Sequence, residues 1–161
     1  MSTSPLHPDL GALGDLVGEW VGEGKGDYPT IDAFTYGERT SFWQVGKPFL
    51  FYMQRTWSLE NDEPLHSEMG YFRPAGVNGV EFVASHPFGV VEISEGSIAG
   101  GTIELRSKKL TPSSTSDPID KVVRVLRIDG DRLSYDFEMA TSGQPLQLHL
   151  KAALQRMDPT G

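Results

Sequence analysis

The chain has 161 residues, a length that fits one domain, because chains divide into several domains mainly beyond roughly 250–300 residues. Fourteen Lys and Arg against 22 Asp and Glu give a formal charge of −8, which argues against nucleic acids and anionic membranes as partners. The lack of cysteine excludes disulfides, thiolate metal sites, iron–sulfur clusters and cysteine nucleophiles.

The first twenty residues combine a polar tail with one short helical pattern. Residues 1–9 are expected to form a flexible tail. Apolar residues then recur at helical spacing from Leu10 to Val17, but two glycines interrupt them, so we expect a short helix that acts as a lid or plug. This stretch lacks the basic and unbroken apolar regions of a secretory signal, and no later window resembles a membrane span. We therefore expect a cytoplasmic location.

The next segment, Gly18–Pro29, reads GEWVGEGKGDYP and follows a period of two. Pro29 favours extended geometry at Tyr28, so a strand is predicted from Trp20 to Pro29. One face of this strand carries Gly18, Trp20, Gly22, Gly24, Gly26 and Tyr28. Glycine inside a strand marks a bend, a bulge or a close approach of a backbone or ligand. Barrel curvature and a bare face for a flat ligand both stay open, and they are compatible.

The rest of the chain indicates short strands joined by turns. The clearest alternation lies in Arg132–Met139, whose odd positions are apolar, and in the weaker run Gly89–Ser94 the same alternation assigns Val91 and Ile93 to the apolar face. Further strands are expected at 36–45, 49–57, 66–73, 79–85, 102–106, 121–128 and 147–154. The polar, proline-containing run Leu110–Pro118 is expected to be a loop. About ten strands with almost no helix predict an antiparallel barrel or sandwich, and closure of a barrel removes exposed edges.

The glycine-rich segment also carries a family motif. GEWVGEGKGDYP has every fixed position of the pattern GxWxGxGxGxYP, so the chain resembles the nitrobindins, a family of haem-binding β-barrels, and looks closest to their actinobacterial branch. The likeness continues at Thr30–Ile31, Gly46–Leu50, His66–Arg73, Ala84–Pro87 and Gly143–Leu150. The resemblance implies an all-β fold: one closed antiparallel barrel over residues 1–161, similar in shape to fatty-acid-binding proteins, with a short N-terminal helix.

The same resemblance assigns His149 as the axial ligand of haem iron and as the catalytic residue. Without cysteine, an axial ligand must come from His, Met or Tyr. Alternation alone places His149 on one face with Gln147 and Lys151, away from the two leucines that flank it. We expect this conflict to disappear if the barrel interior is a ligand cavity and the N-terminal helix covers the outer apolar face of the last strand.

Other site residues follow from the resemblance. It implies haem contacts at Thr30, Gly18, Trp20, Gly22 and Gly24. Apolar cavity walls are expected from Trp20, Tyr28, Phe42, Trp43 and Tyr71. His66 and His86 lie beside turns and are candidate pocket residues, whereas Lys121 and Arg124 are candidate partners of the haem propionates.

In function, the resemblance implies one haem b per subunit, ferric at rest, that binds nitric oxide and isomerises peroxynitrite to nitrate. Two alternatives stay open. One is a haem-free carrier of the fatty-acid-binding type, in which Arg55, Arg73 or Arg127 would hold a carboxylate. The other is a nitric oxide carrier or sensor without turnover, which uses the same residues as the enzyme. An exposed barrel surface is compatible with a homodimer.

Overall fold

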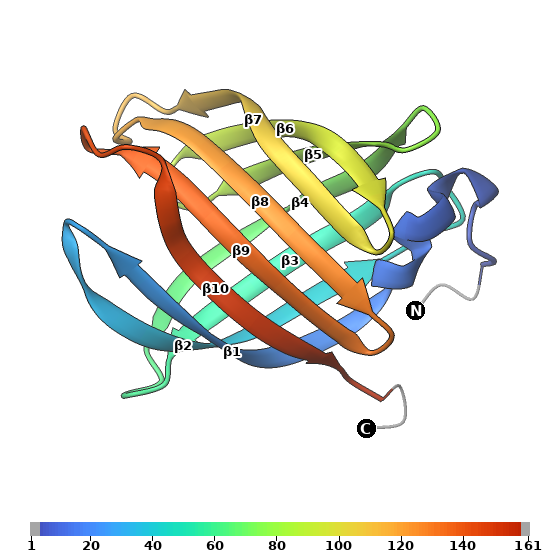
Figure 1. Ribbon diagram of the computed structural model, residues 1–161, viewed down its shortest axis with the longest axis horizontal. Coiled ribbons are helices and arrows are strands. Elements are labelled where there is room, and N and C mark those ends of the chain that lie inside the picture. Colours follow the sequence, from blue (N-terminus) through green and yellow to red (C-terminus); the bar gives the residue numbers. More distant parts are fainter. Residues whose placement is uncertain (1–3, 159–161) are drawn as a thin grey trace.

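The computed structural model describes residues 4–158 and forms a closed barrel of ten antiparallel strands (Figure 1). The elements are the 3-10 helix η1 (Pro8–Leu16) and the strands β1 (Gly18–Tyr28), β2 (Ile31–Trp43), β3 (Leu50–Ser58), β4 (Pro64–Ala75), β5 (Gly79–His86), β6 (Val90–Ala99), β7 (Thr102–Pro112), β8 (Ile119–Asp129), β9 (Arg132–Thr141) and β10 (Gln147–Arg156). Each strand pairs with its neighbours in sequence, and β1 pairs with β10 to close the barrel. The predicted fold class is confirmed.

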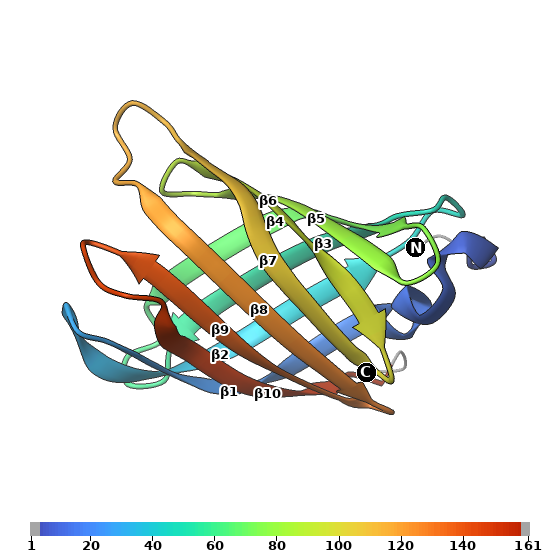
Figure 2. The ribbon, with the colours of Figure 1, turned by 45° about the horizontal axis from the view of Figure 1, so that its top comes forward.

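The two ends of the barrel differ. Helix η1 lies at one end, and the turns β1–β2, β7–β8 and β9–β10 lie at the other (Figures 1 and 2). Leu10, Leu13 and Leu16 of η1 are buried in the apolar core, and the indole Nε1 of Trp20 donates to the Leu16 carbonyl at 2.8 Å. The helix therefore acts as a plug, which is one of the two roles that the sequence predicted.

Part of the predicted tail is packed against the barrel. The side-chain amide of Gln44 donates to the carbonyl of Ser4 at 2.6 Å, and Pro8 and Asp9 already belong to η1. Residues 4–9 therefore do not form a free tail, while residues 1–3 lie outside the described part of the chain.

The glycines of β1 make room for neighbouring atoms. A Cβ on Gly22 would collide with the backbone of β10 at Ala153, which lies in the paired ladder. A Cβ on Gly24 would overlap the ring of Tyr36 from β2. The bare face of β1 is thus filled by the backbone of one neighbour and by aromatic rings of the other, in line with the close approach that glycine permits.

Two sequence expectations about β6 and β7 were wrong. Val90, Glu92 and Ser94 are buried, whereas Val91 is half exposed, so the face assigned to Val91 and Ile93 is reversed. The reason is that the barrel interior is polar at this level, so hydrophobicity does not mark the inner face. Strand β7 also extends to Pro112, into the run that was expected to be a loop.

Candidate functional site

A cavity of about 810 Å³ opens at the end of the barrel opposite η1. Its walls include the side chains of Ile31, Phe34, Tyr36, Leu65, His66, Phe88, Val90, Arg124, Tyr135, Phe137, Met139, His149 and Leu150. Cavities for organic ligands usually have volumes of roughly 300–1,000 Å³, with mainly apolar walls and a few polar groups. The volume of this cavity lies in that range, and its aromatic and aliphatic walls also carry several titratable side chains, which include Glu68, Glu92 and Arg124.

A β-bulge in β10 directs His149 into the cavity. The pairing of β10 with β9 shifts between Leu148 and Leu150, so His149 is the extra residue. His149 and Leu150 consequently both line the cavity, whereas Leu148 is 49% exposed. The expectation that η1 covers the outer face of the last strand was therefore wrong: η1 plugs the barrel end, and the bulge resolves the conflict in the alternation.

A second bulge fixes the tautomer of the His149 ring. The pairing of β1 with β2 shifts between Gly26 and Tyr28, and the carbonyl of Asp27 at that shift lies 3.0 Å from Nδ1 of His149. A carbonyl can only accept, so Nδ1 carries the proton, and the neutral ring keeps its lone pair on Nε2. A histidine held in this way by a backbone carbonyl is the usual arrangement of a metal-binding imidazole.

Aromatic rings surround His149. The ring centroids of Tyr28, Phe137 and Phe34 lie 5.2, 6.2 and 6.4 Å from its own. Tyr28 is itself anchored to β9, because its hydroxyl accepts from the backbone N–H of Thr141 at 3.1 Å. Burial lowers the pKa of His149, and the hydrogen bond to Asp27 only partly opposes this effect. The ring is thus kept neutral, the state in which it can bind a metal.

Deeper in the barrel, Glu38 is 1% exposed and accepts three hydrogen bonds. Its donors are the hydroxyl of Thr40 at 2.6 Å, the side-chain amide of Gln54 at 2.9 Å and the hydroxyl of Tyr135. Burial raises the pKa of Glu38, and the three hydrogen bonds do not offset that rise. The hydroxyl of Tyr135 also bonds that of Tyr36 at 2.8 Å, which links this network to the cavity wall.

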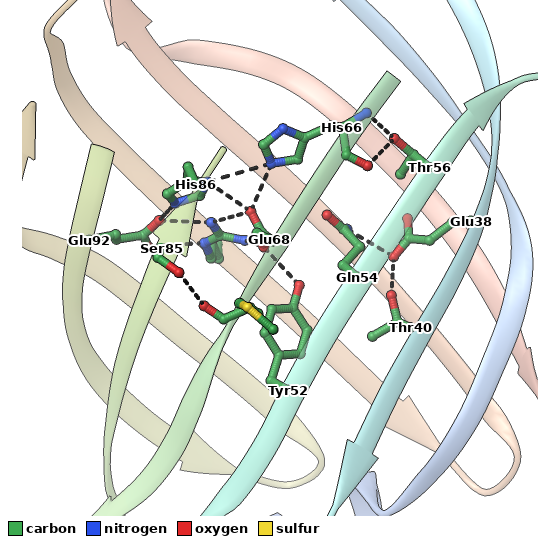
Figure 3. A network of polar contacts seen from close by, with 12 residues as sticks. Glu38, Thr40, Tyr52, Gln54, Thr56, His66, Glu68, Ser85, His86 and Glu92 are labelled. Atoms are coloured by element: carbon green, nitrogen blue, oxygen red, sulfur yellow. Dashed lines mark hydrogen bonds and ion pairs between the residues drawn. The ribbon is translucent and has the colours of Figure 1, made fainter. Parts of the chain in front are cut away.

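A second polar group, the carboxylate–arginine cluster, consists of Glu68, Glu92 and Arg124. Arg124 donates to Glu68 at 2.7 Å and to Glu92 at 2.8 Å, and all three side chains are buried. Burial alone would raise the pKa of each carboxyl, but the guanidinium charge of Arg124, together with hydrogen bonds from Arg124 and the neighbouring histidines, outweighs it: the pKa of Glu68 lies well below its usual range and that of Glu92 falls to about 2. His66 and His86 adjoin this cluster (Figure 3).

The structure separates most of the other predicted contact residues from the cavity. Within residues 4–158, the cavity lining does not include Thr30, Gly18, Trp20, Gly22 or Gly24, and it does not include Tyr28, Phe42, Trp43 or Tyr71. The glycines act indirectly, by admitting Tyr36 and Phe34, which do line it. Lys121 is exposed on β8 and does not line the cavity, whereas Arg124 points into the barrel, where two carboxylates bind its guanidinium.

The buried carboxylates were not predicted from the sequence, although a signal for them was present. Glu68 has the same strand parity as the buried Phe72, and Glu38 has the same parity as the buried Tyr36 and Phe42. Following parity from the most apolar residue of a strand, rather than judging each residue by its own polarity, would have placed these carboxylates inside.

The fold and site define a ligand-binding β-barrel, closed at one end and carrying a metal-competent histidine on the wall of an otherwise largely apolar cavity. A family model described as a THAP4-like, heme-binding beta-barrel domain matches residues 9–156. The chain therefore belongs to this haem-binding family, which confirms the resemblance to the nitrobindins.

Individual relatives agree with this assignment. Peroxynitrite isomerase 1 of Mycolicibacterium paratuberculosis is 49% identical over 157 residues, which cover 94% of this chain and 96% of the relative. Peroxynitrite isomerase of Nocardia farcinica is 43% identical and covers 94% and 92%. The crystal structure of Rv2717c from M. tuberculosis matches with a TM-score of 0.89 at 43% identity, over 96% of this chain and 100% of that one.

The residues of the cavity fit haem. The macrocycle needs an apolar slot and one imidazole whose lone pair faces that slot, and His149 lies on the cavity wall among aromatic rings.

Among the helices of residues 4–158, none has the length and apolar character needed to cross a membrane.

Proposed function

We propose that the protein binds one haem b per subunit, ferric at rest, with Nε2 of His149 as the axial ligand, and isomerises peroxynitrite to nitrate. The observation that carries the proposal is the His149 imidazole, whose tautomer is set by the Asp27 carbonyl and which lines a cavity of about 810 Å³. The choice of substrate rests on the relatives, which are named peroxynitrite isomerase. Bound haem would supply a Lewis-acidic iron that can bind a small anion.

The chain itself would orient the ligand and exclude water. The collar of Tyr28, Phe34 and Phe137 restricts rotation of the His149 ring, and the hydrogen bond to Asp27 holds it in one tautomer. Apolar walls such as Val90 would keep water away from the reacting atoms, which strengthens electrostatic interactions inside the cavity. A small anionic substrate would then react in a confined space.

The haem-free carrier is less well supported. The three arginines that the carrier would need inside the cavity, Arg55, Arg73 and Arg127, are all exposed. Arg124 lies inside, but its guanidinium already binds two carboxylates. A nitric oxide carrier without turnover would use the same cavity and histidine, so kinetics must separate it from the enzyme.

The test uses His149→Ala with His7→Ala, a histidine outside the barrel, as the matched control. Wild type and His7→Ala are expected to take up one equivalent of haemin with a Soret band and to accelerate peroxynitrite decay to nitrate in stopped flow. His149→Ala should lose the stoichiometric band and the acceleration, because the axial ligand is gone. An unchanged Soret spectrum in His149→Ala would contradict the axial assignment. Stoichiometric haem uptake by the wild type without faster peroxynitrite decay would favour the nitric oxide carrier.

A further inference from the structure

Three ligand-type atoms converge at one point of the cavity wall, away from the elements that carry His149. They are Nε2 of His66, Nδ1 of His86 and Oε2 of Glu68, from β4 and the end of β5 (Figure 3). The distances are 3.2 Å between His66 and Glu68, 3.3 Å between His86 and Glu68, and 3.5 Å between the two histidines. We name these three atoms the ligand triangle.

The distances between the three atoms of the ligand triangle match those between ligand atoms in a tetrahedral metal site. Zinc binds histidine nitrogen and carboxylate oxygen at about 2.0–2.1 Å, and at tetrahedral angles this places two ligand atoms about 3.3–3.4 Å apart. Two imidazoles with one carboxylate are also a common set of protein ligands for catalytic zinc, in which the fourth position stays open. All three residues line the cavity, so that fourth position can face it.

The surroundings hold each ligand in place. The other ring nitrogen of His86, Nε2, lies 3.0 Å from Oε1 of Glu92, which is the carboxylate–histidine pairing that orients metal-binding imidazoles. Oε1 of Glu68 accepts from Nη1 of Arg124 and from the hydroxyl of Tyr52, both at 2.7 Å. Oε2 accepts from Nη2 of Arg124 at 3.2 Å and is the oxygen that lies beside the two histidines.

The charges around the ligand triangle also favour a bound cation. The two buried carboxylates of Glu68 and Glu92 face one guanidinium, that of Arg124. Buried charge is costly unless it is paired. A divalent cation at the ligand triangle would supply further positive charge. The rival explanation is an imidazolium at His86 that donates to both carboxylates.

We propose that His66, His86 and Glu68 form a second metal site that takes a divalent transition metal ion of the zinc type, separate from the His149 site and independent of haem. Glu92 is its positioning residue, because it acts through His86.

The experiment uses full-length protein treated with a chelator, dialysed, and titrated with Co²⁺ as a spectroscopic substitute for zinc, with and without haemin. One equivalent of Co²⁺ is expected to give visible ligand-field absorption of a tetrahedral site, and Zn²⁺ should displace it. His66→Ala should weaken Co²⁺ binding by at least about 100-fold, and Glu92→Gln by about 10–100-fold. His7→Ala should bind Co²⁺ as the wild type does.

Folding and the haem site are checked separately. His66 is partly exposed, so His66→Ala is expected to keep the circular dichroism of the wild type, which distinguishes loss of the metal ligand from loss of the fold. The proposal is overturned if no Co²⁺ band appears, which favours the His86 imidazolium. It is also overturned if the band survives His66→Ala but disappears in His149→Ala, because the ion would then occupy the haem-ligand histidine.

Discussion

Glu38 is a buried acid without a cationic partner among its hydrogen-bond donors. Its neighbours are the neutral groups of Thr40, Gln54 and Tyr135, whereas Glu68 and Glu92 bind the guanidinium of Arg124. The pKa of Glu38 is accordingly raised by burial, while the pKa values of the other two are lowered. Buried carboxylates in one barrel thus have opposite protonation preferences, because Glu68 and Glu92 bind Arg124 and adjoin the histidines whereas Glu38 has only neutral donors.

This difference predicts a pH-dependent effect of Glu38→Gln. Because the pKa of Glu38 is higher in the folded than in the unfolded chain, the native state keeps the proton longer, and its stability falls as pH rises from about 4.5 through the folded pKa. Glutamine keeps the acceptor for Thr40 and Gln54 and never ionises. We expect Glu38→Gln to stabilise the protein near neutral pH, by about 1.4 kcal/mol for each unit of pKa elevation, and to gain less at pH 5.

The measurement is the free energy of unfolding in urea between pH 5 and 8. Glu60→Gln, at an exposed turn position, is the control and should leave the free energy near that of the wild type at each pH. A stability difference between Glu38→Gln and wild type that does not grow with pH would show that Glu38 is ionised in the native state.

At the level of single residues, alternation predicted the inward-facing residues correctly where those residues are apolar. The inward positions of Tyr135, Phe137 and Met139 in β9 follow directly from alternation. It failed at Val91 and Glu92, because the inner wall of β6 carries a carboxylate whose burial is compensated by an arginine from β8. Such compensation depends on a contact between strands that are distant in sequence, and no local pattern reports it.

At the level of elements, the number and approximate bounds of the strands were predictable, but the bulges were not. The bulge at Asp27 follows a glycine, which is a weak signal, and the bulge at His149 lies in a run of ordinary strand residues. A bulge changes which residues point inward after it, so periodicity alone put His149 and Leu150 on opposite faces although both line the cavity. Motif resemblance, unlike periodicity, singled out His149, which lies on the cavity wall.

The glycines of β1 give a prediction at this level. Gly24→Ala should destabilise the fold by about 1–3 kcal/mol and weaken haem binding, because the new methyl group displaces Tyr36 from the cavity wall. Gly22→Ala should cost more, because it meets the Ala153 carbonyl in the β1–β10 ladder, which cannot move aside as a ring can.

Urea unfolding and haemin titration would measure both effects. Glu23→Ala, whose side chain points to the opposite face of β1, serves as the control and should change neither quantity appreciably. If both glycine variants kept wild-type stability, the spacing of glycines would reflect the curvature of β1 alone.

For the whole molecule, the two ends of the barrel have separate tasks. The plugged end buries the leucines of η1 and supplies stability, and the open end holds the cavity and His149. Leu13 is 1% exposed, so Leu13→Ala should lower the free energy of unfolding by about 2–5 kcal/mol while the haem stoichiometry stays the same.

Leu59→Ala is the matched control, because Leu59 is 40% exposed in the turn between β3 and β4 and should change stability by less than about 0.5 kcal/mol. Denaturation and haemin titration report on the two ends separately. Loss of haem uptake in a folded Leu13→Ala protein would mean that the plug and the cavity are coupled.

The η1 plug limits how ligands enter and leave the cavity. Because η1 seals one end of the described barrel, the cavity opens only at the opposite end. Whatever enters first is trapped behind whatever enters next, so a tightly held cofactor must be seated before the substrate arrives, and the product must retrace the path of the substrate.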